Sequence, residues 1–358
     1  MNLQIAGAWM GWASGSPLGF SAPRVTGTAQ LRNVRVQLRG VNRALEVASA
    51  EVKLSSDEVR VDKLIAAGGG AHWTGSLALP RGCGVPGACV VHFNLNGDEI
   101  DLGELHEWLG ATPNQRRWYQ VLTADMPARP TFFENLRASG KISAARLRIR
   151  DSVASSVSAA IDLDLGKLKI SDLRANFLGG KHRGDWQGDF TVSPPVFSGS
   201  GTLTAISLAQ VAKTMHDRWI EGDVSGIYQI TASGLSSGEF WQSADGTIEA
   251  DMRDGLFPHV SLGNDSGPLQ IERFEGQARI HDGKVEIKEA RLSSPGGVFR
   301  VSGSASLSRD LDLTLARSPF MTPLNSVSHG YTITGTLAQP RVLQVAGTET
   351  QAQLKQVK

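Results

Sequence analysis

Short runs in which apolar and polar residues alternate recur along the sequence from residue 25 to residue 345, and they constrain the fold more than any other feature. A period of two is typical of β-strands with one apolar and one polar face. In one such run Phe299, Val301 and Ala305 share a face, and arginine and serine residues occupy the other. Asn-Gly and Asp-Gly dipeptides between runs supply the positive φ that tight hairpins require. The sequence therefore predicts an all-β chain built from antiparallel strands.

Helical patterns are few and short. One spans residues 102–109 behind Asp101, and a second spans residues 208–215 behind Ser207. In each case Glu or Gln follows three residues after the capping residue, as in a capping box. Such short helices cannot cover the apolar face of a long sheet. Three alternatives remain: the sheet closes on itself, it packs against a second sheet, or its apolar face stays open and holds a ligand.

Charge and motifs argue against nucleic-acid binding and catalysis. The 36 basic and 35 acidic residues give a net charge of +1 and form no basic patch. The histidines show no metal-ligand spacing, and we expect neither a metal nor a cofactor. Gly234 to Gly238 matches the G-x-S-x-G pattern of hydrolases, but no oxyanion loop accompanies it. Ser236 stands three residues before Glu239, which suits a helix cap, and the chain is predicted to be non-enzymatic.

Cys83 and Cys89 flank a Pro/Gly turn that could bring two strand ends within disulfide distance. A disulfide would suit a periplasmic location, and two reduced thiols are the alternative. Residues 1–20 do not resemble a signal peptide, since they contain no basic residue and glycines interrupt them. No apolar stretch approaches the length of a membrane-spanning helix.

From Ala138 to Val342 the chain resembles the C-terminal region of the AsmA family. The resemblance lies in glycine-punctuated strands, an Ile-Ser-Leu step into a short helix, and a closing Gly-Thr-Leu-Ala-Gln-Pro strand. Its main segments are Gly140-Lys-Ile-Ser-Ala-Ala-Arg-Leu-Arg-Ile149, Gly199-Ser-Gly-Thr-Leu-Thr-Ala-Ile-Ser-Leu208 and Thr334-Gly-Thr-Leu-Ala-Gln-Pro-Arg-Val342. These patterns are degenerate, so they transfer fold better than function.

The resemblance implies an elongated, curved antiparallel sheet that forms a β-groove. It implies a periplasmic protein that binds or conducts phospholipid between membranes and supports outer-membrane assembly. It also implies association with the inner membrane through an N-terminal anchor, and no such anchor is visible in this sequence. The partners expected are a phospholipid or another acyl-chain lipid and envelope proteins. The alternative is a structural or interaction β module that scaffolds envelope proteins without a lipid.

We expect an N-terminal β-groove portion at residues 1–112, a connector at 113–136, the AsmA-like region at 137–345 and a flexible tail at 346–358. The candidates for groove or core positions are apolar residues of the alternating runs. They are Trp73, Leu77, Ile161, Leu163, Trp186, Phe190, Val192, Phe299, Val301, Leu311 and Leu313.

Overall fold

The computed structural model describes residues 2–6, 24–38, 41–81, 88–109, 136–149, 152–214, 216, 218–234, 236–262, 267–306, 310–317 and 329–346. The chain divides into two compact units. Unit 1 comprises Met1–Ala175 and Asp185–Pro195, and unit 2 comprises Asn176–Gly184 and Val196–Lys358. The expected connector lies almost wholly outside the described residues, as does the expected tail.

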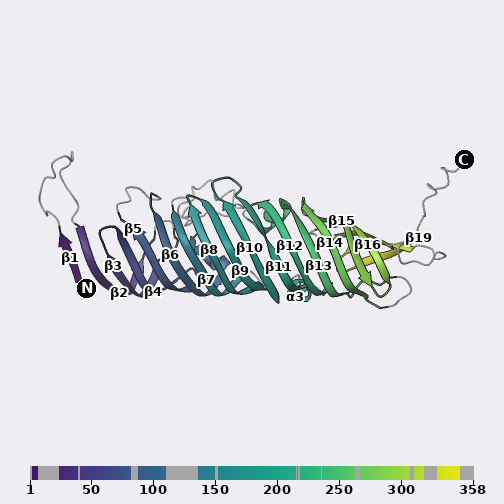
Figure 1. Ribbon diagram of the computed structural model, residues 1–358, viewed down its shortest axis with the longest axis horizontal. Helices are drawn as coiled ribbons and strands as arrows, with labels where there is room; N and C mark the ends of the chain where they lie inside the picture. Colours follow the sequence, from purple (N-terminus) through teal and green to yellow (C-terminus); the bar gives the residue numbers. More distant parts are fainter. Residues whose placement is uncertain are drawn as a thin grey trace. The chain divides into compact units, whose positions relative to one another are not determined.

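Unit 1 is built from strands that pair with their neighbours in chain order (Figure 1). The strands are β1 (Asn2–Ala6), β2 (Arg24–Val36), β3 (Leu45–Leu54), β4 (Glu58–Gly68), β5 (Ala71–Pro80), β6 (Val90–Asp101), β7 (Arg137–Ile149), β8 (Ser152–Asp164) and β9 (Lys167–Phe177). The last two residues of β9 belong to unit 2, and strand β10 (Gly180–Asp189) also falls partly in each unit.

One strand pair of unit 1 departs from the predicted antiparallel pattern. Strands β6 and β7 are parallel, with Val90 opposite Arg137 and Asp101 opposite Arg148. Parallel neighbours require a long crossover connection. The break in alternation after residue 101 supplies it, and α1 (Leu102–Leu109) begins that connection.

Unit 2 continues with antiparallel strands joined mostly by short turns. They are β11 (Val196–Ser207), β12 (Glu221–Ser233), β13 (Asp245–Phe257), β14 (Leu269–His281), β15 (Lys284–Ser294), β16 (Gly297–Ser306), β17 (Asp310–Arg317), β18 (His329–Thr336) and β19 (Pro340–Ala346). Helix α3 (Leu208–Thr214) precedes β12, and α4 (Ser237–Gln242) precedes β13. The prediction of an all-β chain with antiparallel strands and a few short helices is confirmed.

The predicted capping residues act at two of the three helices of the described chain. Asp101 Oδ1 accepts hydrogen bonds from the backbone N–H groups of Gly103 (2.8 Å) and Glu104 (3.2 Å) at the start of α1. Ser236 and Glu239 form a complete capping box at α4, with Ser236 Oγ accepting from the Glu239 N–H at 3.2 Å. Ser236 is therefore a structural cap, as the spacing predicted.

The largest apolar core of the described chain lies on one face of the unit 2 sheet, which we call the inner face. Its most buried members include Ile271, Phe299, Val301 and Leu315, each at most 3% exposed. A smaller cluster in unit 1 contains Val47, Ala50, Leu64 and Ala66.

Candidate functional site

The inner face of the unit 2 sheet lines an apolar cavity of about 470 Å³. Alternate residues of one strand after another point into it, from Val224 on β12 to Ile333 on β18. Because so many adjacent strands line one cavity, this part of the sheet curves around it. The volume lies within the range of about 300–1,000 Å³ that is usual for small-molecule sites.

Apolar side chains form almost the whole wall. The contributors from the strands are Val224, Ala250, Met252, Phe257, Leu269, Phe274, Val285, Ile287, Leu292, Val301, Ala305, Leu311, Leu313, Leu315, Ile333 and Pro340, with Leu208 from α3. Such a surface offers dispersion contacts and excludes water.

A β-bulge in β15 keeps the wall apolar. Ile287 pairs with Gly303 and Ala290 pairs with Val301, so two residues of β15, Lys288 and Glu289, lie opposite the single residue Ser302 of β16. The extra residue shifts the alternation by one position. Lys288 and Glu289 are therefore both exposed, whereas Ala290 is buried on the inner face.

One end of the cavity is formed by the segment before β12 and by the end of β13. Trp219 packs against Phe257 with ring centroids 6.3 Å apart, and His259 also lines the wall here. Trp219 Nε1 is buried and has no hydrogen-bond partner. At the opposite end, Ser306 accepts a hydrogen bond from the Asp310 N–H at 3.0 Å and donates to Asp310 Oδ2 at 3.2 Å.

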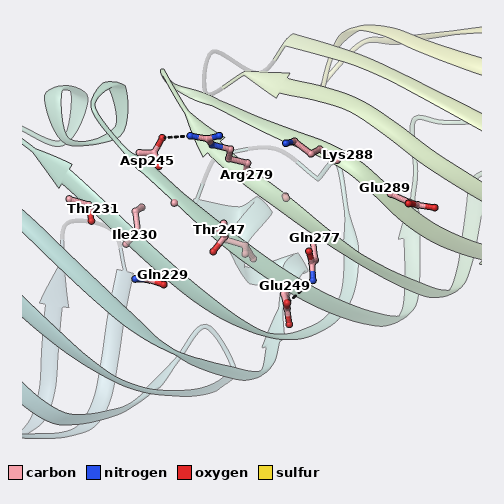
Figure 2. Close-up of a pocket in the computed structure, with 13 residues that line it drawn as sticks. Gln229, Ile230, Thr231, Asp245, Thr247, Glu249, Gln277, Arg279, Lys288 and Glu289 are labelled. Atoms are coloured by element: carbon pink, nitrogen blue, oxygen red, sulfur yellow. Dashed lines mark hydrogen bonds and ion pairs between the residues drawn. The ribbon is translucent and has the colours of Figure 1, made fainter.

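The opposite, outer face of the same strands carries a second hollow of about 1,010 Å³ (Figure 2). Its polar and charged side chains pair across strands. Figure 2 shows this for Arg279, which pairs with Asp245 (3.1 Å), and for Gln277, which donates a hydrogen bond to Glu249 (2.6 Å). Hydrogen bonds from Arg279 and then His281 hold the pKa of Asp245 below its ordinary value. These groups largely satisfy one another, as expected of a solvated face.

The predicted residues of unit 2 fall in or beside the apolar cavity. Val301, Leu311 and Leu313 line it. Phe299 is 3% exposed in the adjoining core and makes an edge-on contact with Tyr331, with centroids 6.0 Å apart. The alternation of β16 and β17 was enough to place these four on the inner face.

The predicted residues of unit 1 have other surroundings. Leu77 packs on the small cluster, and Trp73 Nε1 donates to the Gly68 carbonyl at 3.0 Å. Leu163 is buried and Ile161 is half-buried on β8. These positions belong to the unit 1 sheet and contribute nothing to the unit 2 cavity.

Three further candidates follow the start of β10 in the sequence. Trp186 and Phe190 are half-buried. Val192 is 42% exposed, which differs from the predicted groove or core position. The reason is that β10 ends at Asp189, so the alternation does not extend to Val192.

Cys89 is disulfide-bonded in the structure. Cys83, the other cysteine of the sequence, lies outside the described residues. Among the residues that the structure describes, no three His, Cys, Asp or Glu side chains are grouped so that they could hold a metal ion.

Sequence reasoning missed the Trp219 end of the cavity. Trp219 lies between α3 and β12, and His259 follows the end of β13, so neither belongs to an alternating run. The one available signal was a cluster of aromatic residues next to strand ends, and that pattern alone does not distinguish a cavity wall from an ordinary core.

Comparisons of the chain with protein-family models, with curated proteins and with solved structures found no match. Within the described ranges, no helix has both the length and the apolar character needed to cross a membrane. Fold and site together define an all-β chain whose unit 2 sheet surrounds an apolar cavity.

Proposed function

We propose that this protein binds the acyl chain of a lipid, most simply a phospholipid, in the apolar cavity of unit 2, and that it acts without chemical catalysis. The observation that carries the proposal is a cavity of about 470 Å³ with an almost wholly apolar wall. Burial of each methylene group contributes about 0.8 kcal/mol. A long acyl chain gains on the order of 10 kcal/mol on the same basis, before the costs of association.

The dimensions of the cavity suit an extended chain. On β15 its wall runs from Val285 to Leu292, which at about 3.3 Å per residue corresponds to roughly 20 Å. One leaflet of a bilayer has a hydrocarbon thickness of about 15 Å, half that of the whole core. The cavity therefore offers enough length for one acyl chain of ordinary size.

The wider role that we propose is the one implied by the AsmA resemblance. In it the protein works in the periplasm, associated with the inner membrane, and passes phospholipid towards the outer membrane. The sheet architecture and the apolar cavity support this role, and Cys89 in a disulfide suits an oxidising compartment.

Native mass spectrometry of protein purified without detergent tests the binding step. We expect a co-purifying phospholipid. A photoreactive residue at Leu313, in the cavity wall, should crosslink to it, and the same residue at Leu343, an exposed leucine of β19, should not.

Two variants in which tryptophan replaces an alanine give a matched test. Ala305→Trp places an indole in the cavity, whereas Ala316→Trp places it on an exposed position of β17. We expect bound lipid to fall at least fivefold in the first variant and to stay unchanged in the second. A wild-type protein that carries no lipid and shows no crosslink from Leu313 would instead favour a structural or interaction module.

A further inference from the structure

Trp219 lines one end of the cavity, and its indole nitrogen is unusual among the polar groups of the chain. It is a buried hydrogen-bond donor without an acceptor, the one such side-chain atom in the described part of the chain. Buried polar groups are nearly always paired, because an unpaired donor loses its bonds to water and gains none in return. An unpaired donor on a residue that lines an apolar cavity therefore calls for an explanation.

Two other, half-buried tryptophans of the chain show how an indole N–H is normally satisfied. Trp73 Nε1 donates to the Gly68 carbonyl at 3.0 Å, and Trp108 Nε1 donates to the Arg43 carbonyl at 2.9 Å. Trp219 shares the packing of a core aromatic residue, since it contacts Phe257, but it lacks such an acceptor. The difference lies in the hydrogen bond and not in the packing.

We propose that Trp219 Nε1 donates a hydrogen bond to a carbonyl or carboxylate oxygen at the head of the acyl chain that fills the cavity. The inference rests on the proposed function. It adds that Trp219 selects ligands that carry an oxygen acceptor and fixes which end of the acyl chain lies beside it. Neighbouring atoms cover the nitrogen, so the proposed hydrogen bond requires a small rotation of the indole that turns the nitrogen towards the cavity.

The far end of the cavity supports this direction. There the Ser306 hydroxyl already bonds with Asp310, whose carboxylate would repel an anionic head group. At the Trp219 end the neighbouring Arg218 and the wall residue His259 are exposed, together with the acidic Glu221. The head of the ligand therefore lies at Trp219, and its methyl end points towards Ala305 and Leu337.

The test compares three probes that share a twelve-carbon chain: dodecanoate, methyl dodecanoate and dodecyltrimethylammonium. The first two carry an oxygen acceptor and the third carries none. Calorimetric titrations use the wild-type protein, Trp219→Phe, which keeps the aromatic packing, and Trp241→Phe, which changes a tryptophan that is 45% exposed on α4.

We expect Trp219→Phe to weaken the binding of dodecanoate and methyl dodecanoate by about 3- to 10-fold, the range for loss of one hydrogen bond. Binding of dodecyltrimethylammonium should change less than twofold, and Trp241→Phe should bind all three probes as the wild type does. Equal losses for all three probes, or no loss for any, would overturn the role of Trp219 while leaving lipid binding intact. If no probe binds the wild-type protein, the proposed function fails and this inference fails with it.

A second measurement does not depend on the variant. In wild-type protein labelled with ¹⁵N-tryptophan, the indole proton of Trp219 should shift downfield with dodecanoate and with methyl dodecanoate, as expected for a new hydrogen bond. It should not shift downfield with dodecyltrimethylammonium. An equal downfield shift with all three probes would show that the chemical shift of the indole proton reports the filling of the cavity and not a new hydrogen bond.

Discussion

The two faces of the unit 2 sheet are formed by the same strands, yet they differ in the polarity of their side chains and in how fully their polar groups are paired. On the outer face, charged residues such as Asp245 and Arg279 pair across neighbouring strands and remain in water. On the inner face, apolar residues such as Met252 and Leu315 are buried but still surround a cavity of about 470 Å³. Trp219 Nε1 also stays without a partner there.

This contrast is the basis for placing the proposed ligand on the inner face. The outer hollow is larger, but its charged groups already interact with one another and with solvent. The inner cavity is smaller, and its wall is almost wholly apolar. The proposed lipid site lies on the inner face because of its apolar wall and its unpaired donor, although the outer hollow is larger.

The largest expected difference between the faces concerns stability. Leu315→Ala removes a side chain that is 2% exposed on the inner face of β17, and such truncations cost about 2–5 kcal/mol. Thr314→Ala, at the exposed neighbouring position, should change the free energy of unfolding by less than about 0.5 kcal/mol. Chemical denaturation measures both variants. Similar small losses would mean that the inner face of β17 is not a packed core.

A smaller effect should come from a polar pair in unit 2. His182 Nε2 lies 2.6 Å from Tyr228 Oη, and partial burial lowers the pKa of His182 below its ordinary value of 6.5. The unfolded chain therefore takes up a proton at a higher pH than the folded one. The contribution to stability is full above about pH 6.5 and is lost as the pH falls towards the lower pKa of the folded state.

Thermal unfolding between pH 7.5 and pH 5 measures this effect. His182→Gln should reduce the loss of stability on acidification, and His92→Gln, a change at an exposed histidine, should leave it as in the wild type. An unchanged pH slope in His182→Gln would place the acid sensitivity elsewhere.

The smallest effect is expected on the outer face. Arg279→Gln removes the group that most lowers the pKa of Asp245, so this pKa should rise towards its ordinary value, with His281 still in place. NMR titration of the Asp245 carboxyl measures the change. Stability at pH 7 should hardly move, because exposed ion pairs contribute little.

Arg300→Gln is the control for that titration, because Arg300 pairs with Glu289 and not with Asp245. It should leave the pKa of Asp245 unaltered. A marked loss of stability in Arg279→Gln would show that the outer face contributes to the fold more than solvated pairs do.

The sequence by itself determined the strands, their turns and the side of the sheet on which most residues lie. Alternation placed Phe299, Val301 and Leu313 together, because successive side chains of a strand point to opposite faces. The spacing of Ser236 and Glu239 likewise predicted the α4 cap, since a capping box involves only neighbouring residues. These features are local, and local patterns are sufficient for them.

Only the tertiary structure decided how the strands associate and what they enclose. The parallel pairing of β6 with β7, the bulge at Lys288 and Glu289, and the end of β10 before Val192 depend on contacts between segments. The cavity depends on the curvature of many strands at once, and the isolation of Trp219 Nε1 depends on what surrounds it. A period of two identifies which residues share a face, but it carries no information about the space that the face leaves unfilled.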